Sequence, residues 1–578
     1  MKKELQAGSR SKVLAVVVLA IMAVFVVRLF YLQVIQHDKY VAMAREEQVQ
    51  RLVIPSERGE IYVMDGETPV KIVLNEVIYT VFADPSIIEK EDIGKVTEVM
   101  RRVAGGNLQP NIDTLLAETD SRYQILAKGV TRKQADLIKK EGLSGIGFQQ
   151  ETRRVYPEGQ LAAQTLGFVN AQGGQYGVEG KLNDRLTGEP GLLQAVTDVS
   201  RVPLTIGDEY INRPPKHGDD LVLTIDRNIQ SRAEQALADG LERSGATNAS
   251  MMVMDPQTGE VMAMANLPTY NPADFSNVQD GAVFNNATVS MPYEAGSVIK
   301  TMMVATGINE GAITADSTYN NTGSIRVADR VIGNAIDGQL GTISMQTALS
   351  YSLNTGMVTI AQRLGDGTIN EAAQKTMYDY YYHKFGLGQR TGIQVTGEAS
   401  GRIVAPDQVY GNAVQYSNMS FGQGMNVTMV QVCAAFSAIV NGGMRYAPTV
   451  IEGVADEEGR VQPDPQDSGR RVLSESTSDQ TRTMMTTARK IIASTVDPEG
   501  YEIGGKTGTS QVLEDGVYSD DETIATYIGY GGSETPRYVI MVQVSGDDMV
   551  LEGSKHAAPI FADMSNWMID YLQLQPKE

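Results

Sequence analysis

The N-terminal region holds the longest apolar run of the chain, which extends without a break from Val13 to Val27. Arg28 interrupts the run, and residues 29–35 continue it with one polar residue, Gln33. A helix over residues 13–35 would be about 35 Å long, which is enough to cross the hydrocarbon core of a bilayer. The pattern therefore predicts a single transmembrane anchor at residues 13–35.

The residues that flank this run indicate its orientation. The preceding segment, residues 1–12, carries one acidic residue and the basic residues Lys2, Lys3, Arg10 and Lys12. Basic flanks usually stay in the cytoplasm, so we expect a cytoplasmic tail at 1–12 and residues 36–578 outside. The alternative is a cleaved signal peptide, with Ala42-Met43-Ala44 as the cleavage site. We favour an uncleaved anchor, because the apolar core is too long and that site lies too far beyond it.

Strand-like and helix-like patterns mix in the rest of the chain. Residues 58–66 predict a strand that ends in an Asp-Gly turn, residues 75–82 predict a second strand, and residues 86–143 show a helical pattern with charged faces. Beyond residue 221, short apolar runs predict buried strands, including a hairpin at residues 251–265, with helices between them. These patterns indicate an α+β fold.

A polar segment divides this region in two. Residues 204–219 contain Pro214-Pro215 and Gly218, which is typical of a linker. We therefore predict four parts: a tail at 1–12, the anchor at 13–35, a mixed α+β stalk at 36–217 and a second folded domain at 218–578.

Charge and composition exclude some classes of function. The net charge is −21 and the isoelectric point is near 4.8, which argues against nucleic acid as a partner because phosphate binding needs a basic surface. The lone cysteine, Cys433, lies in an apolar helical pattern and is expected to be a buried, inert thiol. The four histidines show no metal-ligand spacing, so no metal site is expected.

The first candidate chemistry lies in the stretch Glu294-Ala295-Gly296-Ser297-Val298-Ile299-Lys300. Gly296 permits a tight turn, and Ser297 is expected to open a helix on which Lys300, three residues later, shares its face. The amine of Lys300 could then take the proton of the Ser297 hydroxyl, which is a poor nucleophile without a neighbouring base. The N–H groups at the helix start would suit an oxyanion. An isolated Ser-x-x-Lys is more often a capped helix with a surface lysine.

Two further motifs follow downstream, Ser352-Leu353-Asn354 and Lys506-Thr507-Gly508-Thr509. Each alone could be ordinary, the first a capped turn and the second the end of a surface strand. Ser-x-x-Lys, Ser-x-Asn and Lys-Thr-Gly in this order resemble the signature of penicillin-binding proteins and serine β-lactamases. Their order and flanking sequence make a joint coincidence improbable.

The resemblance extends from about residue 50 to residue 565. The segments Arg58-Gly59-Glu60-Ile61, Arg154-Val155-Tyr156-Pro157-Glu158-Gly159 and Gly177-Val178-Glu179 are similar to the pedestal of class B penicillin-binding proteins. Thr197–Pro203 resembles the division type, and Ser420-Phe421-Gly422-Gln423-Gly424 also matches the family. The family usually has proline where this chain has Ala295, which loosens the turn before Ser297 and removes no reactive group.

This resemblance implies an elongated α+β pedestal at 36–217 and a transpeptidase domain at 218–578, with an antiparallel sheet flanked by helices. It implies that Ser297 forms an acyl-enzyme with Lys300 as its base, that Ser352 relays a proton, and that Asn354 positions the donor peptide and Lys300. Burial and the like charge of Lys506 should lower the pKa of Lys300. Lys506, Thr507 and Thr509 would bind a carboxylate, and Gly508 would let the strand approach the substrate. The backbone N–H groups of Ser297 and Thr509 would form the oxyanion hole.

The implied reaction is peptidoglycan transpeptidation, without a metal or organic cofactor. Its substrates would be a D-Ala-D-Ala stem peptide and an amine on a neighbouring stem peptide, and β-lactams would acylate Ser297. Expected partners are the cytoplasmic membrane, a membrane glycosyltransferase and other division or elongation proteins. Three alternatives stay open: a carboxypeptidase or β-lactamase that uses water as acceptor, a β-lactam receptor that signals, and a silent scaffold of a cell-wall complex.

Overall fold

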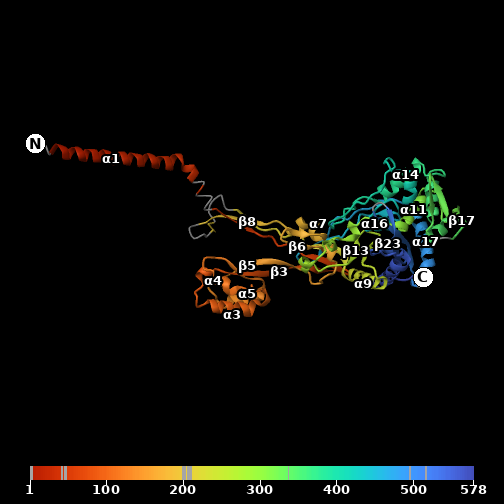
Figure 1. The fold of residues 1–578 in the computed structure, drawn as a ribbon, viewed down its shortest axis with the longest axis horizontal. Helices are drawn as coiled ribbons and strands as arrows, with labels where there is room; N and C mark the ends of the chain where they lie inside the picture. Colours follow the sequence, from red (N-terminus) through yellow and green to blue (C-terminus); the bar gives the residue numbers. More distant parts are fainter. Residues whose placement is uncertain are drawn as a thin grey trace. The chain divides into compact units, whose positions relative to one another are not determined.

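The computed structural model describes residues 4–40, 43, 49–197, 203–204, 211–335, 338–493, 496–514 and 517–577. The chain divides into two compact units (Figure 1). The first unit comprises Met1–Arg58 and Thr187–Gly218, and the second comprises Gly59–Leu186 and Asp219–Glu578.

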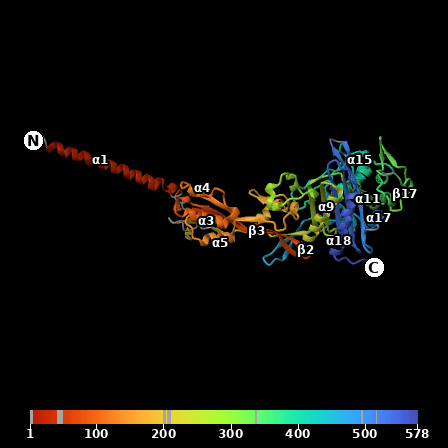
Figure 2. The same cartoon turned by 60° about the horizontal axis from the view of Figure 1, so that its bottom comes forward.

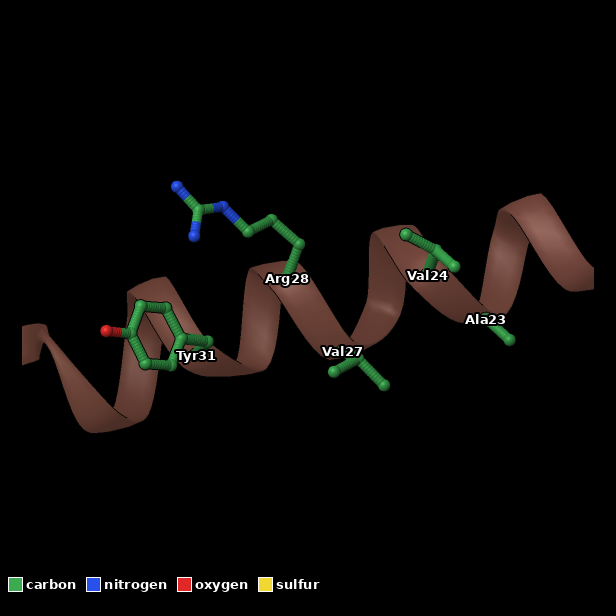
Figure 3. Close-up of a pocket in the computed structure, with 5 residues that line it drawn as sticks. All are labelled: Ala23, Val24, Val27, Arg28 and Tyr31. Atoms are coloured by element: carbon green, nitrogen blue, oxygen red, sulfur yellow. The ribbon is translucent and has the colours of Figure 1, made fainter.

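The first unit contains the predicted anchor. Helix α1 (Glu4–Phe30) continues into one π-helical turn, η1 (Tyr31–Ile35), and the segment Arg10–Ile35 is long and apolar enough to cross a membrane. Arg28 interrupts this apolar segment, and its guanidinium lies 5.5 Å from the centre of the Tyr31 ring (Figure 3). The prediction of one long apolar helix near the N-terminus is confirmed, and this helix fits a membrane-anchored protein.

The first unit also contains a small antiparallel sheet. Strand β8 (Gly191–Thr197) pairs with β1 (Val49–Ile54), β9 (Pro203–Leu204) and β10 (Ile211–Arg213). Strand β10 lies inside the polar segment predicted to be a linker. That part of the prediction is wrong, because three residues are too few to show an alternating pattern in the sequence.

The second unit begins with the predicted hairpin. Strands β2 (Ile61–Asp65) and β3 (Thr68–Ala83) flank the Asp-Gly turn, where Gly66 has a φ of +61°. Strand β3 continues for 16 residues and pairs farther along with β4 (Gln124–Thr131) and β5 (Ile146–Val155). The apolar side of these strands packs on helices α3 (Ile93–Ala104), α4 (Ile112–Ala117) and α5 (Arg132–Lys140). Strand β4 lies in the region expected to be helical, because a short apolar run does not by itself distinguish strand from helix.

Two of the pedestal-like sequence segments meet in this unit. Arg154, near the end of β5, donates a 2.7 Å hydrogen bond to the carboxylate of Glu179 in helix α7 (Gly177–Lys181). The exposed fractions of the two side chains are 5% and 0%. A buried charge needs a partner of opposite sign, so these two motif residues depend on each other.

One sheet joins the residues on either side of residue 218. Strand β11 (Leu221–Asp226) pairs in parallel with β2 and antiparallel with β19 (Ile451–Ala455), which in turn pairs with β20 (Val461–Pro463). The strand order is β20-β19-β11-β2-β3-β4. Residues expected in the pedestal and residues expected in the catalytic domain therefore share backbone hydrogen bonds.

The central sheet of the second unit has five antiparallel strands in the order β13-β12-β24-β23-β22. They are β12 (Asn248–Met254), β13 (Val261–Leu267), β22 (Glu502–Glu514), β23 (Val517–Gly532) and β24 (Pro536–Ser545). The predicted hairpin at 251–265 is confirmed as β12 and β13. Strand β22 lies at the edge of this sheet and carries the Lys-Thr-Gly motif.

Helices cover both faces of this sheet (Figures 1 and 2). Met251 and Val253 pack with residues of α9 (Arg227–Ser244) and α18 (Ala558–Tyr571). Met252 and Met254 point to the other face and pack with α11 (Lys300–Asn309), α16 (Met429–Val440) and α17 (Glu475–Ala493). Successive side chains of a strand face opposite sides, so a sheet covered twice requires apolar residues at every position. The prediction of an antiparallel sheet flanked by helices is confirmed.

Candidate active site

Ser297 lies in a short 3₁₀ turn, η6 (Gly296–Ile299), directly before helix α11. We expected it at the start of an α-helix. In a 3₁₀ turn, residues three apart lie directly above one another, so the turn keeps Ser297 and Lys300 on one face. Gly296 has a φ of +60°, which favours glycine, and a Cβ there would lie 3.0 Å from the carbonyl oxygen of Thr509. The turn before Ser297 therefore packs closely on strand β22.

A loop between α15 (Ala413–Met419) and α16 holds the other side of this turn. The N–H of Gly296 donates a 3.1 Å hydrogen bond to the carbonyl of Gly422. A Cβ on Gly422 would collide with the backbone of Gly296, and Gly422 has a φ of +88°. The glycines of the Ser420–Gly424 segment thus allow two backbones to meet beside Ser297.

Lys300 is buried, with 1% of its surface exposed. Its Nζ donates to the backbone oxygen of Ser352 at 2.6 Å, to Ser352 Oγ at 3.2 Å and to Asn354 Oδ1 at 2.7 Å. Burial and the nearby charge of Lys506 lower the pKa of Lys300 well below its usual value, as expected. All hydrogen bonds of this amine to described residues go to the Ser352–Asn354 turn, and none goes to Ser297 Oγ.

The Ser352–Asn354 motif forms a turn between helices α12 (Met345–Ser350) and α13 (Asn354–Arg363). Ser352 has a φ of +56°, which is uncommon for a residue with a side chain and often marks a functional site. Asn354 donates to the carbonyl of Gly333 at 2.9 Å while it accepts from Lys300. Its amide is thereby fixed from both ends.

The third motif lies on edge strand β22. Lys506 is buried, which lowers its pKa to about 7, and its Nζ donates to Thr507 O and Thr507 Oγ1 at 3.1 and 3.2 Å. A Cβ on Gly508 would collide with Thr526 Oγ1 and lie 3.0 Å from the Ala295 carbonyl oxygen. Only glycine lets the strand lie so close to the Ser297 turn.

The three motifs, far apart in sequence, therefore converge. Lys300 donates hydrogen bonds to the Ser352–Asn354 turn, and the charge of Lys506 lowers its pKa. The backbone of Thr509 lies against Gly296, the glycine before Ser297. Thr509 is exposed, and its Oγ1 accepts a 3.1 Å hydrogen bond from the N–H of Gly553.

No role was predicted for Glu294, which joins this site. Its carboxylate accepts hydrogen bonds from the N–H of Gly424 and from the hydroxyl of Tyr518. Glu294 precedes a glycine turn and Tyr518 lies beyond the Lys-Thr-Gly motif, so neither periodicity nor spacing could connect them.

Cys433 is buried, as predicted, and burial raises the pKa of its thiol. Within the ranges that the structure describes, no group of three or more His, Cys, Asp or Glu side chains could hold a metal ion.

The sequence was then compared with known protein families. Residues 249–566 match the model of the penicillin binding protein transpeptidase domain, and residues 53–223 match that of the penicillin-binding protein dimerisation domain. The chain belongs to the penicillin-binding protein transpeptidase family. It is a class B penicillin-binding protein, with a dimerisation domain ahead of the transpeptidase domain, and its relatives are of the division type.

Relatives and solved structures agree with this family. Penicillin-binding protein PbpB of Mycolicibacterium smegmatis is 31% identical over 497 residues, covering 82% of this chain and 74% of that protein. Peptidoglycan D,D-transpeptidase FtsI of Escherichia coli K12 is 28% identical, covering 97% of this chain and 91% of that protein. The crystal structure of penicillin binding protein 2X from Streptococcus thermophilus has a TM-score of 0.74 at 24% identity, covers 91% of this chain and 80% of that one, and shows the shared fold.

Proposed function

We propose that this penicillin-binding protein is a membrane-anchored peptidoglycan D,D-transpeptidase that cross-links stem peptides in cell-wall synthesis at the septum. The observation that carries the proposal is the buried amine of Lys300, which lies one 3₁₀ turn after Ser297 and bonds Ser352 and Asn354. The relative FtsI is named a peptidoglycan D,D-transpeptidase, which supports the same reaction.

In the proposed first step, Ser297 Oγ attacks the carbonyl carbon of the D-Ala-D-Ala amide. Lys300 would take the hydroxyl proton, which requires a neutral amine, and its lowered pKa favours that form. The oxyanion would be held by the N–H groups of Ser297 and Thr509. Ser352 Oγ, 3.2 Å from the Lys300 amine, would pass the proton to the leaving nitrogen, and D-Ala would depart from the Ser297 ester.

In the second step, the amine of a neighbouring stem peptide attacks this ester. Its nitrogen loses a proton, Ser297 regains one, and the new amide is the cross-link. Lys300 and Ser352 would move these protons in the reverse direction. The steps need no metal ion or organic cofactor.

Substrate recognition would use edge strand β22, whose outer side has no partner strand among the described residues. An extended donor peptide could add to this edge through backbone hydrogen bonds. Lys506, Thr507 and Thr509 would bind its terminal carboxylate. Because the pKa of Lys506 is about 7 without a ligand, a bound carboxylate would favour its charged form.

The architecture supports a matching topology. We propose that residues 1–12 are cytoplasmic, that residues 13–35 anchor the protein, and that the pedestal at 36–217 and the transpeptidase domain at 218–578 lie outside the cytoplasm. The anchor and pedestal would bring the protein to a membrane glycosyltransferase and other division proteins. A reporter fused after Glu578 that is active only outside the cytoplasm should therefore be active.

The function is tested with purified full-length protein and a stem-peptide substrate. We expect D-Ala release that depends on Ser297, and a cross-linked product when an amine acceptor is added. A β-lactam should form a covalent adduct with the wild-type protein and none with Ser297→Ala. D-Ala release that yields only hydrolysed peptide, even at high acceptor concentration, would instead indicate a carboxypeptidase. Absence of both adduct and D-Ala release would leave a non-catalytic scaffold.

A further inference from the structure

Glu294 lies three residues before Ser297 and is partly buried. Its Oε1 accepts a 2.8 Å hydrogen bond from the N–H of Gly424, and the hydroxyl of Tyr518 lies 3.1 Å from both carboxylate oxygens. Neither Glu294 nor Tyr518 has a role in the acyl-transfer steps above. Their contacts nevertheless join three separate segments around the nucleophile.

The first of these segments is the Ser297 turn, and the second is the loop that contains Gly422 and Gly424. This loop bonds the turn twice, because Gly422 accepts from the N–H of Gly296 and Gly424 donates to Glu294. The two contacts lie on either side of Ala295. The side chain of Glu294 therefore adds a second hydrogen bond between the loop and the turn, beside the backbone bond of Gly296.

The third segment is the outer end of the β22–β23 hairpin. Tyr518 pairs with Leu513 there, farther along the same two strands from the paired residues Lys506 and Ile528. A hydrogen bond from Tyr518, on strand β23, to Glu294 thus fixes the outer end of the β22–β23 hairpin to the residue that leads into the Ser297 turn. The near end is fixed by the close contact between Gly508 and Ala295.

The electrostatics of the pair favour a strong bond. Partial burial raises the pKa of Glu294 above its usual value, and partial burial with the neighbouring carboxylate raises the pKa of Tyr518, which is 36% exposed, to about 12. At neutral pH the phenol keeps its proton and donates a hydrogen bond to the charged carboxylate. Such a bond is stronger than one between two neutral partners. Among the described residues, Tyr518 is the titratable side chain that bonds Glu294.

We propose that Glu294 and Tyr518 are positioning residues for acyl transfer, which together hold the β22–β23 hairpin at a fixed distance from Ser297. This inference rests on the proposed function. It assigns the pair to the alignment of the Lys506–Thr509 strand with the nucleophile, and it assigns no proton transfer to either residue.

The test compares acylation by one β-lactam in full-length wild type, Glu294→Gln, Tyr518→Phe and the double variant. The second-order rate is measured by intact mass from about pH 8 to about pH 5, a range that brackets protonation of a carboxyl with a raised pKa. Glu294→Gln removes the charge of the acceptor and Tyr518→Phe removes the donor of a charge-assisted hydrogen bond, so we expect about a tenfold loss at the alkaline end. The double variant should lose little more than either single variant, because both act through one contact.

The pH profile separates positioning from simple destabilisation. As the pH falls through the raised pKa of Glu294, the wild type loses its charged acceptor. The ratio of the acylation rate of the wild type to that of Glu294→Gln should therefore fall toward one. A change that acted only through stability would keep the same ratio at every pH at which the proteins stay folded.

A second Glu–Tyr pair in this chain provides a matched control. The hydroxyl of Tyr380 donates a 2.6 Å hydrogen bond to Glu310, just beyond the C-terminal end of the helix that begins at Lys300. Glu310→Gln and Tyr380→Phe remove the same kind of bond away from β22, and we expect acylation rates within about twofold of wild type.

Two outcomes would overturn the inference. One is wild-type acylation by both Glu294→Gln and Tyr518→Phe. The other is a loss that is equal at all pH values and is matched by the Glu310 and Tyr380 variants. The proposed function fails in a different way, because the wild-type protein itself would then form no adduct at Ser297.

Discussion

The amine of Lys300 donates a 2.7 Å hydrogen bond to the side-chain oxygen of Asn354. Asn354 is itself held by the carbonyl of Gly333, so the amine has one fixed position at the end of a flexible side chain. The side chain of Lys300 is buried, and the charged form of its amine is disfavoured there. Burial and a fixed acceptor set this lysine apart from a surface cation and support its proposed role as the base.

The charge of Lys506 should tune this base. Lys506→Met removes the like charge that lowers the pKa of Lys300, so the pKa of Lys300 should rise. Because acylation needs neutral Lys300, the acid limb of the acylation rate should move to higher pH in Lys506→Met. Lys506→Arg keeps the charge and should leave the limb at or below its wild-type position. A limb that moves to lower pH in Lys506→Met would contradict the proposed coupling.

Gly508 should tolerate no side chain. A Cβ there collides with Thr526 Oγ1 and presses on the carbonyl of Ala295, so Gly508→Ala must push strand β22 away from the Ser297 turn. We expect a loss of acylation rate of at least about tenfold. The control is Gly94→Ala in helix α3, where a Cβ meets nothing within 4 Å and acylation should be unchanged. Normal acylation by Gly508→Ala would show that this close approach is dispensable.

The pedestal should depend on its buried ion pair. Glu179→Gln removes the carboxylate that hydrogen-bonds the buried guanidinium of Arg154, and we expect a loss of about 3 kcal/mol in the free energy of unfolding. Arg153 and Glu76 form an exposed pair on the same strand pairing, with exposed side-chain fractions of 51% and 40%. Glu76→Gln should cost less than about 1 kcal/mol. Urea unfolding of the full-length variants checks both values, and equal losses would contradict the distinction.

Much of the fold could be predicted from local pattern. The sequence pattern predicted the apolar helix. It also predicted strands covered on both faces, because neighbouring apolar residues such as Met251 and Met252 are buried on opposite faces of the sheet. The sequence did not show that β11 pairs with β2, since pairing between distant strands leaves no local pattern. It also missed β4 and β10, whose apolar runs are too short to define a period.

The motif segments could be recognised in the sequence, whereas their geometry could not. The motifs named Ser297, Lys300 and Lys506, and the structure places their three segments together. The positive φ of Ser352 and the 3₁₀ turn at Ser297 depend on tertiary contacts, which override local helical preference. The contact between Glu294 and Tyr518 joins residues that no motif connects.

The central claim is that Lys300 is the base that activates Ser297, and the acylation rate of Lys300→Arg tests it most directly. Arginine preserves the charge and practically never deprotonates, so it cannot take the serine proton. The second-order rate with a β-lactam is measured by intact mass on purified protein whose folding is verified by thermal unfolding, with Ser297→Ala and Lys506→Arg alongside. We predict no adduct for Lys300→Arg or Ser297→Ala, and a slower but measurable adduct for Lys506→Arg. Wild-type acylation by Lys300→Arg, with none by Lys506→Arg, would contradict the account.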